Sequence, residues 1–188
     1  LTPGKLWQKR DLAVTTDFRD VLGEAGAANL GDWVDRGGVL ITVGNATNFA
    51  ADPAVDAVYI ASPHSEHEAH TMLCLDAGKH VLCEKPFAMN AAEAQAMVDT
   101  AARTGKVLVE AYHYRFHPLF ARVLAVIDSG AIGAVRGITA HFNVRIPPEP
   151  GEIRYDPALG GGAMMDLGCY CVHAARSVMG AEPEVLSA

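Results

Sequence analysis

Three short apolar runs, each followed by a segment with helix-boundary signals, constrain the fold of this chain more than any other feature. The runs are continuous and rich in β-branched residues, and they cover 56–62 (DAVYIAS), 80–84 (HVLCE) and 106–111 (KVLVEA). Continuous apolar strands are typical of parallel sheets that are covered on both faces. We therefore expect an α/β fold that contains the C-terminal part of a Rossmann-type parallel sheet.

Helix-boundary residues fill the intervals between the runs. Ser65 and the glutamate three residues later have the spacing of a capping box, and the helix that follows is expected to end at Gly78. Asn90 has the position of a second helix cap, and Gly105 the position where that helix ends. Pro118 lies in the first turn of a third expected helix. The order strand, helix, strand, helix, strand, helix is that of a doubly wound sheet.

The hydrophobic period changes after this unit. In 138–146 apolar and polar residues alternate, which predicts an antiparallel strand with one face in water. A loop rich in proline and glycine covers 146–162, and 163–179 (AMMDLGCYCVHAARSVM) is interpreted as a mostly buried helix. These features predict the start of a second, α+β domain with an antiparallel sheet.

The expected division is therefore a partial dinucleotide-binding domain over 1–134 and the start of a substrate-binding or oligomerisation domain over 135–188. Residues 1–50 are atypical, because no G-x-G-x-x-G motif follows a strand there or elsewhere in the chain. The first residue is Leu and the last stretch stops soon after a helix, so we expect a fragment of a longer protein.

Composition excludes several classes of protein. Fifteen Lys and Arg against 22 Asp and Glu give a formal charge of −7, which argues against a nucleic-acid or anionic-membrane surface. No apolar run approaches the ~20 residues that span a bilayer. The opening LTPGKLWQKR lacks the apolar core of a secretory signal. Together with only four cysteines, this predicts a cytoplasmic protein.

Glu84, Lys85 and Pro86 stand where the second run must stop, because proline removes a backbone donor and restricts φ. The carboxyl ends of parallel strands are where open α/β sheets bind ligands. Lys85 could hold a cation beside a substrate and stabilise a hydroxyl that loses its proton. On these three residues alone, a lysine facing solvent at a strand end remains the favoured interpretation.

Asp166, Tyr170 and His173 have the spacing i, i+4 and i+7, so a helix would present them on one face among apolar neighbours. Such a polar stripe is either hydrogen-bonded within a core or directed into a cavity, and the residues leave both open. Tyr170 could donate or accept a proton. A phenol titrates near ~10 in water, and we expect a nearby Lys⁺ to lower that pKa.

Histidines at 64, 67 and 70 raise the possibility of a metal site. His64 precedes the expected helix, so the three rings would not converge without a special loop, and the chain has no H-E-x-x-H. We therefore predict no metal. Ser62, Pro63 and His64 are better interpreted as a turn at a strand's carboxyl end, over a cofactor.

Two further segments are ambiguous from the residues alone. In 110–118 (EAYHYRFHP) Arg115 could pair with a phosphate or carboxylate and Tyr112 could line a pocket, although aromatic packing is the simpler interpretation. The three glycines at 160–162 could allow a close backbone approach, although a flexible hinge is the simpler interpretation.

The order of these segments is more specific than any one of them. The stretch VDAVYIASPHSEHEAHTMLCLDAGKHVLCEKPFAMN, then EAYHYRFHP, then LGGGAMMDLGCYCVHAAR resembles the Gfo/Idh/MocA family of oxidoreductases. Within it, the branch with dimeric dihydrodiol dehydrogenases and NADP-dependent xylose dehydrogenases looks most similar. The resemblance covers roughly 52–182, and the combination of E-K-P with D-x-G-x-Y carries it.

The resemblance implies a role for each matching residue. It implies catalysis by Lys85, Asp166 and Tyr170, with the tyrosine as acid or base, and substrate binding by His173 and Tyr112. The positions that it implies near a bound cofactor are Ser62, Pro63, His64, His67, Glu84, Lys85 and Arg115. It also implies a homo-oligomer, a dimer or a tetramer.

The implied reaction is reversible hydride transfer between the nicotinamide of NADP or NAD and the carbinol carbon of a sugar, polyol or cyclic diol. The missing glycine-rich turn leaves an alternative, a truncated and non-catalytic relative that binds a partner or a sugar. The residues do not distinguish NAD from NADP, and they do not name the substrate.

Overall fold

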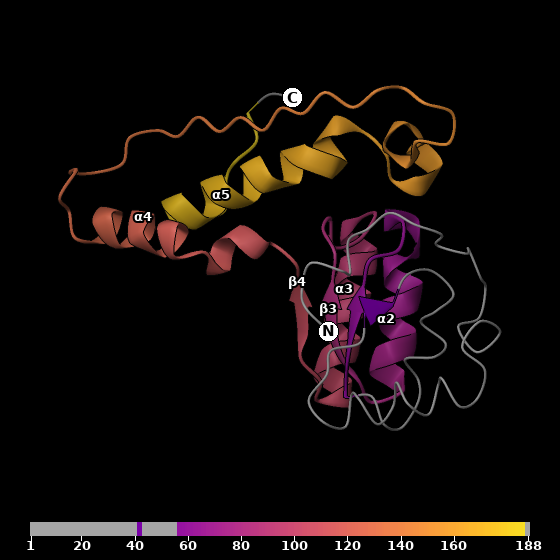
Figure 1. Ribbon diagram of the computed structural model, residues 1–188. Coiled ribbons are helices and arrows are strands. Elements are labelled where there is room, and N and C mark those ends of the chain that lie inside the picture. The colour runs from indigo at the N-terminus through magenta and orange to yellow at the C-terminus, as the bar shows by residue number, and fades with distance from the viewer. Residues whose placement is uncertain (1–40, 43–55, 187–188) are drawn as a thin grey trace, which may run out of the picture.

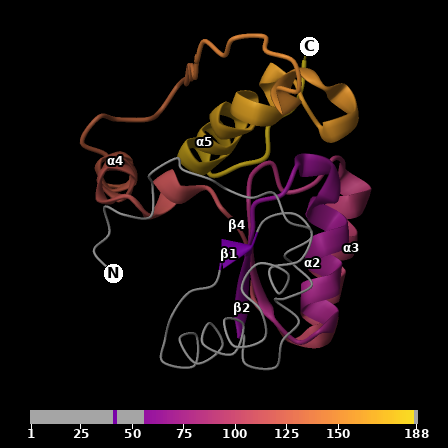
Figure 2. The ribbon, with the colours of Figure 1, turned by 45° about the vertical axis from the view of Figure 1, so that its right-hand side comes forward.

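The computed structural model describes residues 41–42 and 56–186. Figure 1 shows these residues as two parts, a sheet with two helices along it and a second part that contains α4 and α5. The chain passes from the first part to the second where it leaves β4. Figure 2 shows the second part lying over one end of the sheet.

The sheet is parallel throughout, in the order β1-β2-β3-β4. Val58 pairs with Val81, and Leu82 pairs with Val109, so each strand pairs with the next strand along the chain. Glu84 lies one residue past β3, and its N–H still donates to the Ile60 carbonyl over 2.9 Å. The expected Rossmann-type parallel sheet is confirmed. The strands are β1 (Ile41–Thr42), β2 (Ala57–Ile60), β3 (His80–Cys83) and β4 (Leu108–Glu110).

Two helices, α2 (His67–Asp76) and α3 (Ala91–Thr104), cover one face of the sheet (Figure 2). They bury a core in which Ile60, Leu75 and Met97 have no exposed surface. The expected cap of α3 is confirmed, because the Asn90 side chain accepts the Glu93 N–H over 3.0 Å. The packed sheet and helices form a rigid base for the loops at the strand ends.

The capping box predicted at Ser65 is wrong. A 3-10 turn, η3 (His64–Glu66), precedes α2, and the Glu66 N–H donates to the Pro63 carbonyl over 2.9 Å. The Ser65 hydroxyl is buried and has no hydrogen-bond partner within the described part of the chain. The 3-10 turn therefore occupies the position expected for the start of the helix, and α2 begins at His67, one residue after the expected first helical residue.

The second part is built from short turns and two helices, and its α5 ends at Gly180 with positive φ, as expected. Its elements are η4 (His113–Phe116), α4 (Pro118–Asp128), η5 (Ile153–Tyr155), η6 (Pro157–Leu159), the π-helical turn η7 (Met164–Gly168) and α5 (Cys169–Met179).

Two predictions for this part are wrong. Segment 138–146 is extended but pairs with no strand of the described chain, although its alternating pattern remains visible in the sequence. The helix over 163–179 forms, but only Asp166 in it is buried. Both errors have one physical cause. An alternating strand or an apolar helix face is completed only by a partner, and no described strand lies beside 138–146 or covers the outer face of α5.

No helix among residues 56–186 is both long enough and apolar enough to cross a membrane.

Candidate active site

The carboxyl ends of β2, β3 and β4 meet at the edge of the sheet that faces the second part (Figures 1 and 2). From there the chain continues into 61–64, 84–86 and 111–116, the segments in which most of the expected site residues lie. Ligands of open α/β sheets bind at this edge. The placement of Glu84 and Lys85 at the end of β3 is as predicted.

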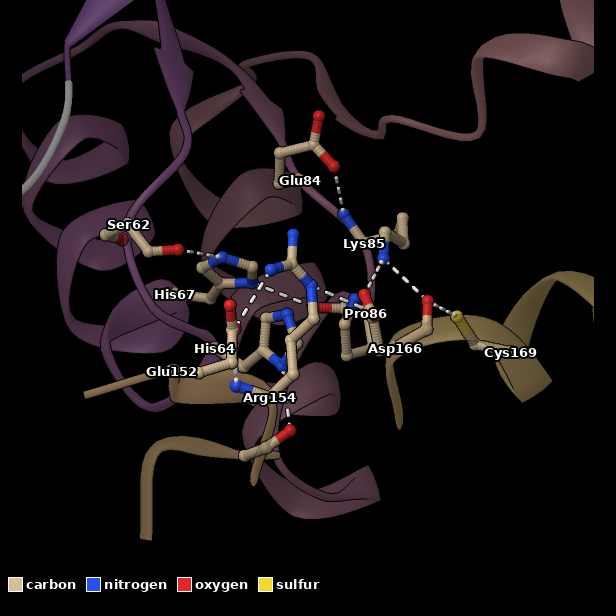
Figure 3. Close-up of polar contacts among 11 residues, drawn as sticks. Ser62, His64, His67, Glu84, Lys85, Pro86, Glu152, Arg154, Asp166 and Cys169 are labelled. Carbon is tan, nitrogen blue, oxygen red and sulfur yellow. Dashed lines mark hydrogen bonds and ion pairs between the residues drawn. The ribbon is translucent and has the colours of Figure 1, made fainter. Parts of the chain in front are cut away.

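Lys85 and Asp166, which lie 81 positions apart in the sequence, are in direct contact. The Lys85 ammonium donates to Asp166 Oδ1 over 2.7 Å and to the Asp166 backbone carbonyl over 2.6 Å (Figure 3). The two side chains are only 13% and 12% exposed. The Lys85–Pro86 peptide bond is cis. A well-shielded ion pair with two hydrogen bonds fixes the ammonium at the edge of the sheet.

Tyr170 lies beside this pair, with the Lys85 Nζ 5.2 Å from the centre of its ring. The two groups expected to converge are therefore neighbours. The expectation that Lys85 lowers the pKa of Tyr170 is wrong, because burial raises that pKa and the charges of Glu84, Cys169, Asp166 and Glu110 raise it further. The ammonium is committed to Asp166, so its charge is offset by that carboxylate. The phenol of Tyr170 stays protonated at neutral pH.

Glu84 is held on two sides. The Tyr59 hydroxyl, from β2, donates to Glu84 Oε1, and the Lys85 backbone N–H donates to Oε2 over 3.1 Å. Burial, followed by the hydrogen bond to Glu84, raises the pKa of Tyr59, so this phenol remains a donor. Glu84 thereby connects the backbone of Lys85 to Tyr59 of the neighbouring strand β2.

The histidines after β2 point to separate partners. His64 Nδ1 lies 2.8 Å from the Gly160 carbonyl oxygen, and His70 Nδ1 lies 3.0 Å from the Ser62 hydroxyl. His67 is fully buried, with Nδ1 2.8 Å from the Pro86 carbonyl and Nε2 3.0 Å from the Ser62 carbonyl. Among the described residues no group of three or more His, Cys, Asp or Glu side chains could hold a metal ion.

The buried ring of His67 cannot touch a ligand. Burial lowers its pKa more than the two carbonyl contacts raise it, so the ring is neutral at pH 7. A neutral imidazole donates from only one nitrogen. Only one of the two carbonyls can therefore accept a hydrogen bond from His67, and the other packs against the ring. His67 lies between the segment that carries Ser62 and the segment that carries Lys85, so any effect on a cofactor passes through those residues.

An aromatic cluster supports the other side of Tyr170. Tyr112 is 5% exposed and stacks on His173 with ring centres 4.2 Å apart, and its edge faces Tyr170 at 5.3 Å. The Tyr114 hydroxyl lies 2.5 Å from His173 Nδ1. Phe142 approaches Tyr170 from the extended segment at 5.2 Å. Tyr112 and His173 were both expected to meet a substrate. Tyr112 instead packs against Tyr170, and His173 packs against Tyr112 and Tyr114.

Tyr170 also lines an open groove of about 450 Å³ between α5 and the extended segment. Its other walls include Tyr114, His141 and Phe142. Arg115 lies elsewhere, in a polar groove of about 530 Å³ with Glu110, His173 and Arg176. Arg115 is exposed and makes no ion pair within the described part of the chain. The structure thus does not bring Arg115 to Lys85.

Sequence reasoning missed three residues of the site. Tyr59 lies within an apolar strand run and Arg154 within a loop rich in proline and glycine, so neither stands out in the sequence. Glu110 lies at the end of β4, where its Oε1 accepts the Phe87 N–H over 3.0 Å, and burial raises its pKa. Only Glu110 had a usable signal, because a carboxylate ends the β4 run just as Glu84 ends the β3 run.

Of the glycines at 160–162, Gly160 and Gly161 pack closely against the rest of the chain, whereas Gly162, with φ +120, has open space around it. A Cβ on Gly160 would lie 2.6 Å from Met89 Sδ and 2.7 Å from His64 Cβ. A Cβ on Gly161 would lie 2.7–2.8 Å from three backbone carbonyl oxygens. The close-approach interpretation was therefore the right one, with the protein itself as the partner.

Comparison with known proteins agrees with this arrangement. A family model described as "Oxidoreductase family, NAD-binding Rossmann fold" (GFO_IDH_MocA) matches residues 26–112, and the "GFO/IDH/MocA C-terminal domain" matches residues 120–188. The chain belongs to the Gfo/Idh/MocA family of oxidoreductases. The first match begins at residue 26, which is upstream of the stretch from about 52 to 182 that resembles the family in the sequence analysis.

Among curated proteins, the chain is 41% identical over 151 residues to "D-xylose 1-dehydrogenase (NADP(+)) 2" of Haloferax volcanii, covering 80% of this chain and 46% of that protein. It is 40% identical over 146 residues to "Trans-1,2-dihydrobenzene-1,2-diol dehydrogenase" of Xenopus tropicalis, covering 77% and 44%. The chain spans a little under half the length of these relatives.

Among solved structures, a 3-ketoreductase from Actinomadura kijaniata, in complex with NADP and TDP-benzene, aligns with a TM-score of 0.66 at 30% identity. The alignment covers 75% of this chain and 49% of that one.

Proposed function

We propose that the chain carries the catalytic residues of an NAD(P)-dependent oxidoreductase that transfers a hydride between nicotinamide and a carbinol or carbonyl carbon. One observation carries the proposal: the Lys85 ammonium, held by Asp166 over 2.7 Å, lies 5.2 Å from the ring centre of Tyr170 at the ligand-binding edge of a parallel sheet. A positioned cation beside a phenol is suited to move a hydroxyl proton.

The donors at the sheet edge fit the nicotinamide end of such a cofactor. The Lys85 ammonium has three N–H groups, and Asp166 takes two of them, so one remains for a ligand. Ser62 and His64 end the neighbouring β2 segment, and Glu84 holds the backbone beneath the ammonium. We propose that Ser62, Pro63, His64, Glu84 and Lys85 hold this cofactor, with His67 supporting them. When bound, the cofactor supplies the hydride acceptor or donor.

Proton handling follows from the state of Tyr170. Because its pKa is raised, the phenol is a proton donor at neutral pH, which suits carbonyl reduction. In the oxidative direction the phenol must first lose its proton, so oxidation should become faster as the pH rises. Lys85 stabilises the oxygen that gains charge, and Asp166 keeps the ammonium in place.

We propose sugars, polyols and cyclic diols as substrates. The support comes from the relatives, which are named as a D-xylose dehydrogenase and a dihydrobenzene-diol dehydrogenase. NADP is favoured over NAD for the same reason, since the xylose enzyme is named for NADP and the 3-ketoreductase was solved with it.

We further propose a homo-oligomer in the cytoplasm, with the boundary between a dinucleotide-binding and a substrate-binding domain near residue 134. All four cysteines of the chain, Cys74, Cys83, Cys169 and Cys171, are free thiols, as in proteins of reducing compartments.

A non-catalytic relative is the second candidate. The observation that favours it is the lack of any strand followed by G-x-G-x-x-G in the sequence, because that turn binds the diphosphate of a dinucleotide. Such a chain would bind a sugar without turnover.

The test measures NADP⁺ binding by protein fluorescence and NADPH formation with D-xylose and with trans-1,2-dihydrobenzene-1,2-diol. Tyr170→Phe and Lys85→Ala should each lower turnover about 100-fold or more. The matched controls are Tyr155→Phe, an exposed tyrosine bonded to the Ile146 carbonyl, and Lys106→Ala. Wild-type turnover in both site variants would disprove the proposal, and NADP⁺-independent sugar binding without turnover would favour the second candidate.

A further inference from the structure

Arg154 joins the Lys85–Asp166 pair from a turn to which the sequence assigned no role. Its Nε lies 3.2 Å from Asp166 Oδ2, and its Nη1 donates to Glu152 Oε1 over 2.9 Å. Figure 3 shows the guanidinium between His67 and Asp166, on the side of the carboxylate away from Cys169. Each oxygen of the Asp166 carboxylate therefore has one cationic partner.

The backbone fixes the point from which Arg154 reaches Asp166. The Gly162 N–H donates to the Arg154 carbonyl over 2.8 Å, and the Asp166 N–H donates to the Gly162 carbonyl over 2.9 Å. Together with the ion pair, these bonds close a ring that joins Arg154 to Asp166 by main chain and side chain. Gly161 lies inside the turn, where a Cβ would lie 2.8 Å from the Arg154 carbonyl oxygen. The backbone position from which the Arg154 side chain extends is therefore set by the fold.

The two cations at Asp166 differ in exposure. The Lys85 side chain is 13% exposed, whereas the Arg154 side chain is 46% exposed and makes the longer contact. Ion pairs this exposed contribute little to stability, because water screens the charges. Arg154 therefore matters chiefly for orientation. A carboxylate with a donor on each oxygen has a fixed plane, whereas one held by a single oxygen can turn about its Cβ–Cγ bond.

We propose that Arg154 is a positioning residue for the catalytic pair. It fixes the plane of the Asp166 carboxylate, so that Oδ1 stays on the Lys85 ammonium and the third N–H of that ammonium stays available beside Tyr170. For turnover this proposal rests on the proposed dehydrogenase function. The geometry of the 152–166 turn does not depend on that function.

The test compares Arg154→Gln and Arg154→Lys with Arg103→Gln as the matched control. Arg103 also makes an ion pair, 2.6 Å from Asp76, in which both side chains are exposed, on the helices far from the site. The measurements on the full chain are kcat and KM with NADP⁺ and D-xylose, the NADP⁺ dissociation constant by fluorescence, and hydrogen exchange of the ligand-free chain.

Arg154→Gln should lower kcat about tenfold while the NADP⁺ dissociation constant changes less than about threefold. Arg154→Lys, which keeps a cation, should recover part of kcat. In Arg154→Gln the amides of Gly162 and Asp166 should exchange about threefold faster or more. Arg103→Gln should change neither kcat nor the exchange of these amides.

Two outcomes would overturn the proposal. The first is unchanged exchange of the Gly162 and Asp166 amides in Arg154→Gln. The second is an NADP⁺ dissociation constant raised tenfold with kcat intact, since that would make Arg154 a cofactor ligand. If the wild type neither binds NADP⁺ nor oxidises D-xylose, the proposed function fails, and the exchange comparison alone still decides the role of Arg154.

Discussion

Lys85 and Asp166 reach the same contact from two differently built regions. Lys85 follows a parallel strand whose neighbours pair along their whole length, and it lies over a core of fully buried side chains. Asp166 lies in a π-helical turn behind a glycine-rich loop, where short turns and side-chain contacts replace regular structure. The Lys85 side is held by many repeated interactions, whereas the Asp166 side is held by a few specific ones. We therefore expect single substitutions to act more strongly on the Asp166 side.

The largest effect is expected from Asp166→Asn, which keeps the shape of the side chain and removes its charge. Lys85 and Arg154 would both lose their shared anionic partner, and the Lys85 and Asp166 side chains are only 13% and 12% exposed. Turnover should fall about 100-fold or more, and the free energy of unfolding should fall by about 1–3 kcal/mol. Steady-state kinetics and urea titration measure the two. Asp156→Asn, at an exposed carboxylate that caps η6, is the control.

Gly160→Ala should follow in size, because its Cβ would overlap Met89 and His64, which belong to the strand-end region. We expect a loss of about 1–3 kcal/mol in the free energy of unfolding by urea titration. Gly130→Ala is a matched control, since Gly130 has φ +71 against φ +80 for Gly160 but open space around it. Equal losses in the two variants would show that only the positive φ matters. The packing of Gly160 against Met89 and His64 would then contribute nothing to stability.

Substitutions at His67 test how much its contacts with the Pro86 and Ser62 carbonyls stabilise the loops at the strand ends. We expect Nδ1 to be the proton donor, because its contact with the Pro86 carbonyl, at 2.8 Å, is the shorter of the two. An Asn amide can replace Nδ1 and a Gln amide can replace Nε2. His67→Asn should therefore lose about 1 kcal/mol of stability and His67→Gln about 2 kcal/mol. A Gln variant that is the more stable of the two would assign the proton to Nε2.

The smallest effect is expected from pH. Burial lowers the pKa of His67, His70 and His173, so the unfolded chain takes up protons before the folded chain does as the pH falls. Stability should therefore be highest above about pH 6.5 and decline below it. Thermal unfolding between pH 5 and pH 8 measures the decline, and its slope should be smaller in His67→Asn. A melting temperature that rises toward pH 5 would contradict the assignment of neutral rings.

The sequence predicted the sheet region that carries Lys85 far better than the region that carries Asp166. Apolar runs, Asn90, Gly105 and Pro118 marked strands and helices that the structure contains, because these signals act over a few residues. The failure at 138–146 concerns a strand that needs a partner from elsewhere in the chain, whereas at Ser65 a local 3-10 turn formed in place of the expected cap. Of the candidate site, Lys85, Asp166 and Tyr170 were found through spacing and resemblance. Arg154 and Tyr59 were missed because nothing near them in the sequence indicates their partners.

The sequence by itself determined the parallel sheet, the position of Glu84 and Lys85 at its carboxyl edge, and the family to which the chain belongs. Each of these depends on local pattern, where residue order and backbone geometry are directly linked. Only the tertiary structure decided that the pKa of Tyr170 is raised, that His67 is a buried tie and that Arg154 shares Asp166 with Lys85. Those properties arise from burial and from charges brought together across the fold, and neither is encoded within a short stretch of sequence.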